Sequence, residues 1–320
     1  MGERWNGDGS RVRRWLPRAA ALGAALVALS VALSGCSPTP DPEATRDSLV
    51  EATQSPAPDE RDEVAEALAQ YDATTHPESI AEPLECSRYL VITARGTGER
   101  PSGQLLSTVA RLISEARPGE VEIVDLDYPA DGDVKLGATR GVRLLIDIVN
   151  QQSVLCAEQR FILLGYSQGA LIIGDALTAP EYRIVGTVAG TLISAAKARI
   201  AAVVFYGDPR FLGSEAFGVG SFDPALNGLL PRPPGSLEAV ADRLRSYCEA
   251  DDIVCQSTLA LEGSGHVVYY SNGMQQDGAA FVITRLDPPA PPEDGADESK
   301  EQAPVRDDAP EESERSEQTD

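Results

Sequence analysis

One short motif in this chain combines the residue types and the spacing of a serine nucleophile. The motif is G-x-S-x-G with Ser167 at its centre, and it lies between the apolar run 161–165 and a stretch with helical spacing over 168–177. In that context the motif is typical of a sharp strand-to-helix turn that presents the serine hydroxyl at the top of a sheet. The N-terminal end of the following helix carries partial positive charge and free N–H groups, which stabilise a developing oxyanion. The pattern therefore predicts nucleophilic catalysis by Ser167.

The base that would activate this serine must be one of two histidines. His76 lies in a polar N-terminal stretch, whereas His266 follows a Gly-Ser-Gly sequence late in the chain. A lone histidine is ordinarily a structural or surface residue. Since Ser167 has no other candidate base inside the domain, we predict that His266 accepts its proton.

The acid that would orient this histidine should lie between Ser167 and His266, in the chain order of α/β hydrolases. Six aspartates in that interval are candidates: Asp175, Asp208, Asp223, Asp242, Asp251 and Asp252. The last two lie between Cys248 and Cys255, and a disulfide that closed so short a loop would hold a carboxylate rigidly. The loop also follows the last predicted strand. The residues alone leave the choice open, although they favour this loop.

The elements that must position these residues alternate between strands and helices. Strands are predicted at 88–94, 121–126, 161–165, 201–205 and 243–247, and helices at 105–116, 134–154, 168–177 and 272–286. Apolar strands that alternate with helices indicate a parallel sheet covered on both faces. We therefore predict a single α/β-hydrolase domain over residues 85–286, with a five-stranded, mostly parallel sheet.

Taken together, these features resemble the cutinase family over about residues 86–286. The resemblance rests on GYSQG, the Cys-bracketed aspartate and the late histidine, and on ARGTGE at 94–99, YPA at 128–130 and GDP at 207–209. It implies that Asp252 is the triad acid, although Asp251 stands where many members have glycine. It also implies that Thr97 and the backbone N–H of Gln168 form the oxyanion hole.

Four cysteines lie inside the predicted domain, an even number that suggests two disulfides in an exported protein. The resemblance implies the pairs Cys86–Cys156 and Cys248–Cys255. The first pair also makes physical sense, because its cysteines precede the first and third strands and would meet at one end of a parallel sheet. No histidine cluster accompanies the cysteines, so we predict no metal and no cofactor.

The resemblance implies a serine esterase that cleaves carboxylic esters through an acyl-enzyme. We expect lipid or polyester-like esters with short to medium acyl chains, and a monomer. Acetylxylan esterases resemble cutinases, so a carbohydrate esterase is the first alternative, and a non-catalytic envelope binding protein is the second. Both tryptophans, Trp5 and Trp15, precede the domain, which favours acyl lipids over stacking sugar rings.

The acyl-binding region is less well defined by the sequence. The long Gly- and Pro-rich segment 212–236 contains apolar residues that could border an acyl groove or could equally be packed onto the core. No segment predicts a helix long enough to serve as a lid. The resemblance implies an open site.

The net charge of −23 comes mainly from the two flanks of the domain. Residues 37–85 contain 13 acidic and 2 basic side chains, residues 287–320 contain 13 and 3, and residues 86–286 contain 22 and 17. This balance argues against nucleic acid as a partner, because phosphate binding needs clustered cations. We expect residues 36–84 to be an acidic Pro/Ala-rich spacer, with a helix at about 60–71, and residues 287–320 to be a disordered tail.

Residues 1–35 have the pattern of an export signal. Basic residues precede the uncharged apolar run 19–33, which is too short to span a bilayer comfortably. Leu33-Ser34-Gly35-Cys36 then resembles a bacterial lipobox, in which a diacylglycerol is attached to the cysteine. We predict a lipid anchor at Cys36 on the outer face of the cell membrane; the alternative is an ordinary cleavage site and a secreted protein. The Arg13-Arg14 pair leaves twin-arginine export open beside the general route.

The lipid anchor can be tested directly in a bacterial host that processes lipoproteins. Labelled fatty acid should enter the wild-type chain but not Cys36→Ala, because two acyl chains on one thiol give stable membrane attachment. Equal labelling of both chains, or of neither, would contradict the prediction.

Overall fold

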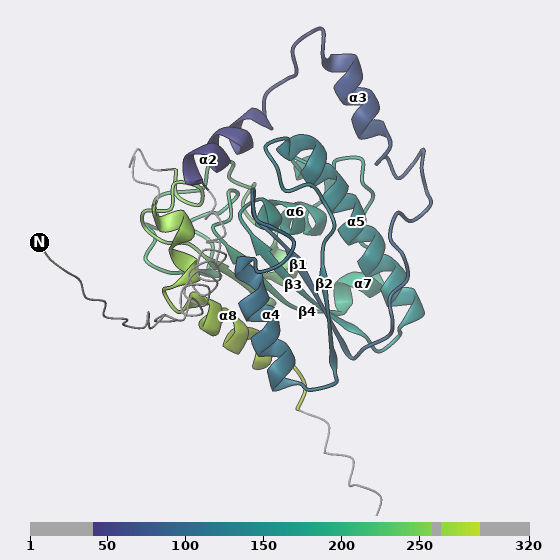
Figure 1. The fold of residues 1–320 in the computed structure, drawn as a ribbon, viewed down its shortest axis with the longest axis vertical. Helices are drawn as coiled ribbons and strands as arrows, with labels where there is room; N and C mark the ends of the chain where they lie inside the picture. Colours follow the sequence, from purple (N-terminus) through teal and green to yellow (C-terminus); the bar gives the residue numbers. More distant parts are fainter. Residues whose placement is uncertain (1–40, 258–263, 289–320) are drawn as a thin grey trace, which may run out of the picture. The chain divides into compact units, whose positions relative to one another are not determined.

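The centre of the domain is a six-stranded sheet in which every neighbouring pair of strands is parallel (Figure 1). A computed structural model describes residues 41–257 and 264–288 of the 320-residue chain. The strands lie in the order β2-β1-β3-β4-β6-β5. Their bounds are β1 Tyr89–Ala94, β2 Val121–Asp125, β3 Arg160–Tyr166, β4 Ile200–Tyr206, β5 Gly218–Val219 and β6 Leu244–Tyr247. The predicted α/β fold is confirmed.

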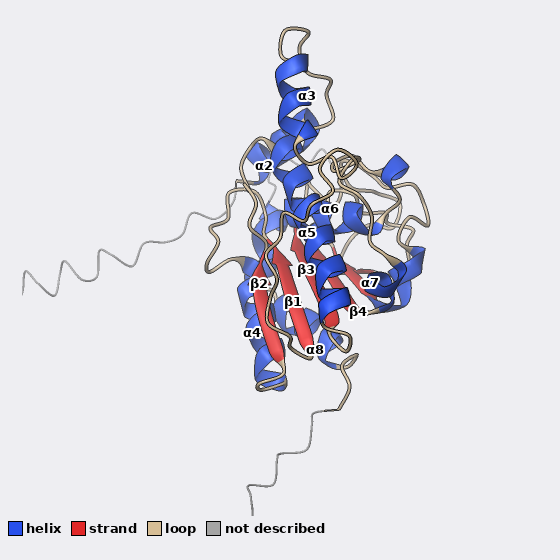
Figure 2. Ribbon diagram, turned by 90° about the vertical axis from the view of Figure 1, so that its right-hand side faces the viewer, coloured by secondary structure: helices blue, strands red, loops and turns tan. Residues whose placement is uncertain are grey.

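Helices cover both faces of the sheet (Figure 2). Helix α4 packs against α8 on one face, and α5 packs against α6 and α7 on the other. The bounds are α4 Leu105–Ala116, α5 Val134–Leu155, α6 Gln168–Leu177, α7 Ser194–Ala198 and α8 Met274–Ile283. The described residues also form short 3₁₀ helices: η1 Pro180–Tyr182, η2 Glu238–Arg243 and η3 Ser264–Tyr270. None of the helices within the described ranges is both long and apolar enough to cross a membrane.

The burial of the strands explains their apolar sequences. Strands β1 and β4 are buried at every residue, and β3 at every residue after its first, because layers of helices exclude water from both faces. Strand β2 lies at the edge of the sheet and is half-exposed. The central strands therefore end in a dry environment, and any polar group placed there must find a partner within the protein.

The sheet has one strand more than the predicted five, which corrects the sequence analysis. Strand β5 pairs Gly218 with Ser246 and Val219 with Tyr247. It lies inside the Gly- and Pro-rich segment 212–236, where two residues beside glycines give no alternating pattern. Most of the apolar residues of that segment are packed onto the core, since Phe217, Leu229 and Leu230 contact the main hydrophobic cluster.

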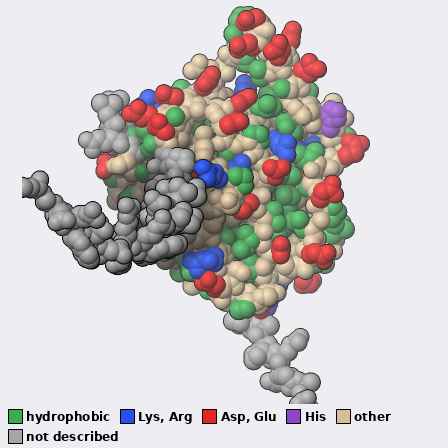
Figure 3. Space-filling view, viewed as in Figure 1, with side chains coloured by type: hydrophobic (Ala, Val, Ile, Leu, Met, Phe, Trp, Pro, Cys, Tyr) green, Lys and Arg blue, Asp and Glu red, His purple; other side chains and the backbone are tan. Residues whose placement is uncertain are grey.

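The N-terminal segment has more structure than a spacer would have. Helix α3 (Arg61–Ala69) lies where a helix was predicted, whereas α2 (Pro42–Glu51) was not anticipated. Helix α2 begins with Asp41, whose carboxylate accepts hydrogen bonds from the first-turn N–H groups, and with proline at its first position. Both helices are rich in acidic residues, which gather at the top of Figure 3.

The chain after α3 is bound to α5 by polar contacts. The buried Arg143 donates to the Glu78 carbonyl at 2.7 Å and pairs with Asp147, which in turn accepts from the Ile80 N–H. The Ala73 N–H donates to the Val188 carbonyl at 2.9 Å. Residues 72–84 therefore lie along the domain.

Both disulfides are the pairs that the resemblance implied. Cys86 is joined to Cys156 and Cys248 to Cys255, with Cα–Cα distances of 5.6 and 5.9 Å. The first bridge ties the chain entering β1 to the chain entering β3, which is the neighbouring strand. It therefore holds the N-terminal segment to the base of the sheet.

The first bridge should be the more important for stability. Replacing Cys86 and Cys156 by serine should lower the free energy of unfolding by about 2–4 kcal/mol, because the bridge restrains a long loop in the unfolded chain. The sequence separation is 70 for this pair and only 7 for Cys248 and Cys255, so the second double replacement should cost less. Urea denaturation measures both, and an equal or larger loss for the second pair would contradict this account.

Candidate active site

Ser167 occupies the strained turn between β3 and α6. Its φ of 53° is the only positive φ of a non-glycine residue in the described ranges. Such a backbone conformation costs on the order of 1–3 kcal/mol and persists only where the surroundings enforce it. A Cβ at Gly165 would lie 2.8 Å from Ala170 backbone atoms, and one at Gly169 would lie 1.8 Å from the Ala94 carbonyl oxygen. The two glycines of the motif are therefore needed for close packing around the serine.

Three predicted residues lie in one hydrogen-bonded row. Ser167 Oγ lies 2.9 Å from His266 Nε2, and His266 Nδ1 lies 2.9 Å from Asp252 Oδ1. All three side chains are buried, with exposures of 1% for the serine and 0% for the other two. The serine comes from the β3–α6 turn, the aspartate from the disulfide loop after β6 and the histidine from η3. The row can transfer a proton from the serine to the imidazole while the carboxylate holds the ring.

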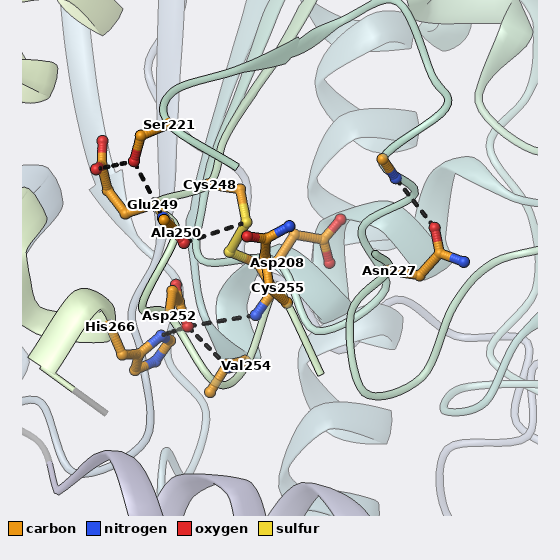
Figure 4. Close-up of a disulfide and its surroundings, with 12 residues drawn as sticks. Asp208, Ser221, Asn227, Cys248, Glu249, Ala250, Asp252, Val254, Cys255 and His266 are labelled. Carbon is orange, nitrogen blue, oxygen red and sulfur yellow. Dashed lines mark hydrogen bonds and ion pairs between the residues drawn. A yellow bond between two sulfur atoms is a disulfide. The ribbon is translucent and has the colours of Figure 1, made fainter. Parts of the chain in front are cut away.

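The Asp252 carboxylate lies beside His266, Val254 and Cys255 (Figure 4), and it has four hydrogen-bond partners in all. Its Oδ1 accepts from the N–H groups of Val254 and Cys255 as well as from the histidine, and its Oδ2 accepts from the Tyr269 hydroxyl at 2.6 Å. Burial raises the pKa of the Asp252 carboxyl, but His266 and these hydrogen bonds lower it by more, so the net pKa lies below the usual 3.8. The carboxylate is therefore ionised in the folded protein at neutral pH.

The other candidate acids have different surroundings. Asp175 and Asp208 are buried against Arg210 and Arg232, respectively. Asp223, Asp242 and Asp251 are exposed. Of the six aspartates, Asp252 is the one bonded to His266.

Tyr166 supports the histidine from the side. Its ring is stacked on the His266 ring with centroids 5.1 Å apart, and its hydroxyl donates to the His266 carbonyl at 2.7 Å. Burial raises the pKa of Tyr166 well above its usual value, so the phenol keeps its proton. Gly207 also lies close to the ring, since a Cβ there would lie 2.8–2.9 Å from His266 ring atoms and Asp252 Oδ2. The imidazole is thus confined before any substrate arrives.

The two predicted oxyanion residues lie beside each other across the turn. The Thr97 hydroxyl donates to Gln168 Oε1 at 3.1 Å. Gln168 is the first residue of α6, where backbone N–H groups have no acceptor within the helix. Thr97 lies in the loop after β1, directly beyond the carbonyl of Ala94 that Gly169 approaches. This contact brings the loop after β1 and the start of α6 together beside the serine; a role in binding an oxyanion stays a prediction.

A buried glutamate connects that loop to the segment that carries the histidine. Glu99 accepts hydrogen bonds from the N–H groups of Gly96 and Leu105, each at 2.7 Å, and from the Tyr270 hydroxyl at the end of η3. Burial raises the pKa of Glu99 above its usual value, and the three hydrogen bonds offset only part of that effect. The glutamate therefore links the loop of Thr97 to η3.

Sequence reasoning missed these supporting residues to different degrees. Glu99 and Gly207 stand in pieces that were already recognised as similar to the family, and Tyr166 adjoins the nucleophile. Their roles depend on contacts between distant segments, such as Tyr166 with His266 across 100 residues and Glu99 with Tyr270 across 171, which no local pattern contains. Tyr269 had no signal in the sequence.

The ionised state of Asp252 has a consequence for acid stability. Its folded-state pKa is depressed, so its contribution to stability is present above the unfolded value of 3.8 and is lost as the pH falls through the folded value. Asp252→Asn should therefore unfold at lower urea than the wild type at neutral pH, and the difference should shrink below pH 3.8. Asp251→Asn is the matched control, because that neighbouring side chain is exposed. A gap that stayed constant with pH would contradict the assignment.

Residues 85–286 match a family model described as Cutinase. The chain is 32% identical over 200 residues to the Cutinase of Kineococcus radiotolerans, an alignment that covers 62% of this chain and 61% of that protein. It is 29% identical over 222 residues to Acetylxylan esterase 2 of Talaromyces purpureogenus, covering 65% of this chain and 91% of that protein. Among solved structures, the catalytic core domain of acetyl xylan esterase from Trichoderma reesei matches with a TM-score of 0.56 at 28% identity, covering 63% of this chain and all of that one. Because the family model spans more than half of the 320 residues, this protein belongs to the cutinase family.

Proposed function

We propose that this protein is a serine esterase that hydrolyses carboxylic esters through an acyl-enzyme on Ser167. The observation that carries the proposal is the row of two 2.9 Å contacts that joins Ser167, His266 and Asp252 in a buried site. Membership of the cutinase family supports the same reaction class. A serine with a base in contact, and an acid that orients the base, is the arrangement that activates a hydroxyl for attack on a carbonyl carbon.

The reaction follows from the positions of these groups. His266 Nε2 accepts the Ser167 proton while Oγ attacks the ester carbonyl, and Asp252 stabilises the imidazolium that forms. The free N–H groups at Thr97 and Gln168 bind the oxyanion of the tetrahedral intermediate. The imidazolium then protonates the leaving alcohol, and the same histidine activates a water molecule that releases the acid.

We propose esters of lipid or polyester type with short to medium acyl chains as the substrates. The described part of the chain contains no tryptophan, the side chain best suited to stack on sugar rings, since both tryptophans precede residue 41. The second candidate, a carbohydrate deacetylase, is favoured by the similarity to two proteins named as acetylxylan esterases. We also propose that the protein is exported and is tethered through Cys36 to the outer face of the cell membrane.

The nucleophile and the substrate class can be tested together. The full mature chain should hydrolyse p-nitrophenyl esters, and Ser167→Ala should lower the turnover number by on the order of 10⁴ or more, because the acyl-enzyme can no longer form. Ser271→Ala, an exposed serine that follows η3, is the matched control and should keep full activity.

The profile from acetyl to palmitoyl esters, with acetylated xylan beside it, separates the two candidates. Activity on butyryl and longer esters supports the lipid or polyester assignment. Activity confined to acetyl esters, together with release of acetate from xylan, would replace it by the carbohydrate esterase. If Ser167→Ala hydrolysed esters as fast as the wild type, the proposed mechanism would be wrong for both classes of substrate.

A further inference from the structure

The reacting atoms of the proposed esterase are closed off from solvent. Ser167 is 1% exposed, and Gln168 and His266 are 0% exposed. An ester carbonyl must come within about 3–3.5 Å of the serine oxygen to react. The arrangement that the structure describes therefore excludes substrate, and some element above the site has to move.

Helix α2 is the helix before the domain that packs closest to the segment carrying the catalytic histidine. It packs against η3, the segment that carries His266, and its purple ribbon passes below the histidine in Figure 4. Thr45 and Leu49, four residues apart on one helix face, are 2% and 0% exposed, whereas the adjacent Val50 is 40% exposed. Leu49 belongs to the main hydrophobic cluster of the domain although it lies in the N-terminal segment.

Helix α2 contacts the domain through apolar side chains, and its polar contacts are local. Every hydrogen bond and ion pair made by the described residues 41–54 stays within that segment. An open hollow of about 770 Å³ separates α2 and α3 from residues 132–136 beside it. Moving α2 away from η3 would therefore break no polar contact with the domain. The main cost would be the exposure of the buried Leu49 side chain to water.

We propose that α2 is a roof over the nucleophile, and that Leu49 holds this roof shut and thereby restricts which esters reach Ser167. The inference rests on the proposed function, because it concerns access to the same serine. When the roof lifts, the apolar face of α2 and the surface beneath it are exposed beside the serine. Such a surface favours an acyl chain over a sugar. The roof also differs from the open site that the family resemblance implied, because α2 lies outside the resembling region.

An equilibrium between closed and open forms makes a kinetic prediction. If the open form is a minor one, populated at about 0.1–10%, apparent affinity is reduced by that fraction while the chemical step is unchanged. Weakening the roof should lower KM and leave kcat almost unaltered. A change in folding or in the reacting groups would instead lower kcat.

The first test compares two neighbouring positions on α2. Leu49→Glu places a charge in the buried face and should open the roof, so a fluorophosphonate should label Ser167 at least about tenfold faster and KM for butyryl and longer esters should fall. Val50→Glu adds the same charge on the exposed face and should behave as the wild type. Equal labelling rates for the two variants would overturn the proposal.

The second test locks the roof. The Ser48 Oγ lies 3.4 Å from the position that a Cβ at Gly132 would take, so a disulfide between Ser48→Cys and Gly132→Cys would join α2 to the loop before α5. The oxidised double variant should label at least about tenfold more slowly than the wild type. Mild reduction that leaves the wild-type rate unchanged should restore it, and each single variant should label normally. A locked chain that labels at the wild-type rate would also overturn the roof.

Failure of the roof and failure of the esterase assignment give different results. If neither the wild type nor Leu49→Glu labels at Ser167 or cleaves any ester, the proposed function fails and the roof fails with it. If the wild type labels at Ser167 and the locked and Leu49→Glu forms match its rate, only the roof fails.

Discussion

The strand-to-helix turn at Ser167 is the constraint on which the remainder of the site depends. Its backbone can reach a φ of 53° only because Gly165 and Gly169 let α6 and the end of β1 approach the turn directly. That approach brings the loop with Thr97 to the serine from one side. The neighbouring strand β4 is followed by Gly207, where the lack of a side chain leaves room for His266 and Asp252. Three adjacent parallel strands thus deliver their carboxyl ends to one point.

The site at the ends of these strands is buried from water, so its polar groups need hydrogen-bond partners within the protein. Asp252 and Glu99 are carboxyl groups buried among aromatic rings, and each is surrounded by hydrogen-bond donors from several segments. Their pKa values move in opposite directions, because His266 faces Asp252, whereas burial is the larger influence on Glu99. Two tyrosines of η3, Tyr269 and Tyr270, donate to one carboxyl each, so this short helix is attached to both sides of the serine.

The N-terminal segment is the part of the chain whose role changes most once the tertiary structure is known. Its acidity and its prolines are typical of a solvated spacer, and much of α3 is indeed exposed. Yet Arg143 and Asp147 bind residues 78 and 80 to α5, and Leu49 joins the core next to η3. The N-terminal segment therefore runs from α2, near the catalytic end of the sheet, to the Cys86–Cys156 bridge at the opposite end. The roof proposed for α2 would couple the segment preceding the domain to the access of substrate.

The sequence by itself determined the nucleophile motif, the alternation of strands and helices, and the short list of candidate acids. These features are local, since a G-x-S-x-G turn, an apolar strand and an amphipathic helix each depend on residues close together in the chain. Family resemblance, rather than spacing, was needed to choose Asp252 and the cysteine pairs. Only the tertiary structure decided that Tyr166, Tyr269 and Glu99 support the site, that a sixth strand forms at residues 218 and 219, and that α2 packs against η3. The physical reason is that each of these features depends on contacts between distant segments. The sequence around a leucine such as Leu49 does not indicate the surface against which its side chain is buried.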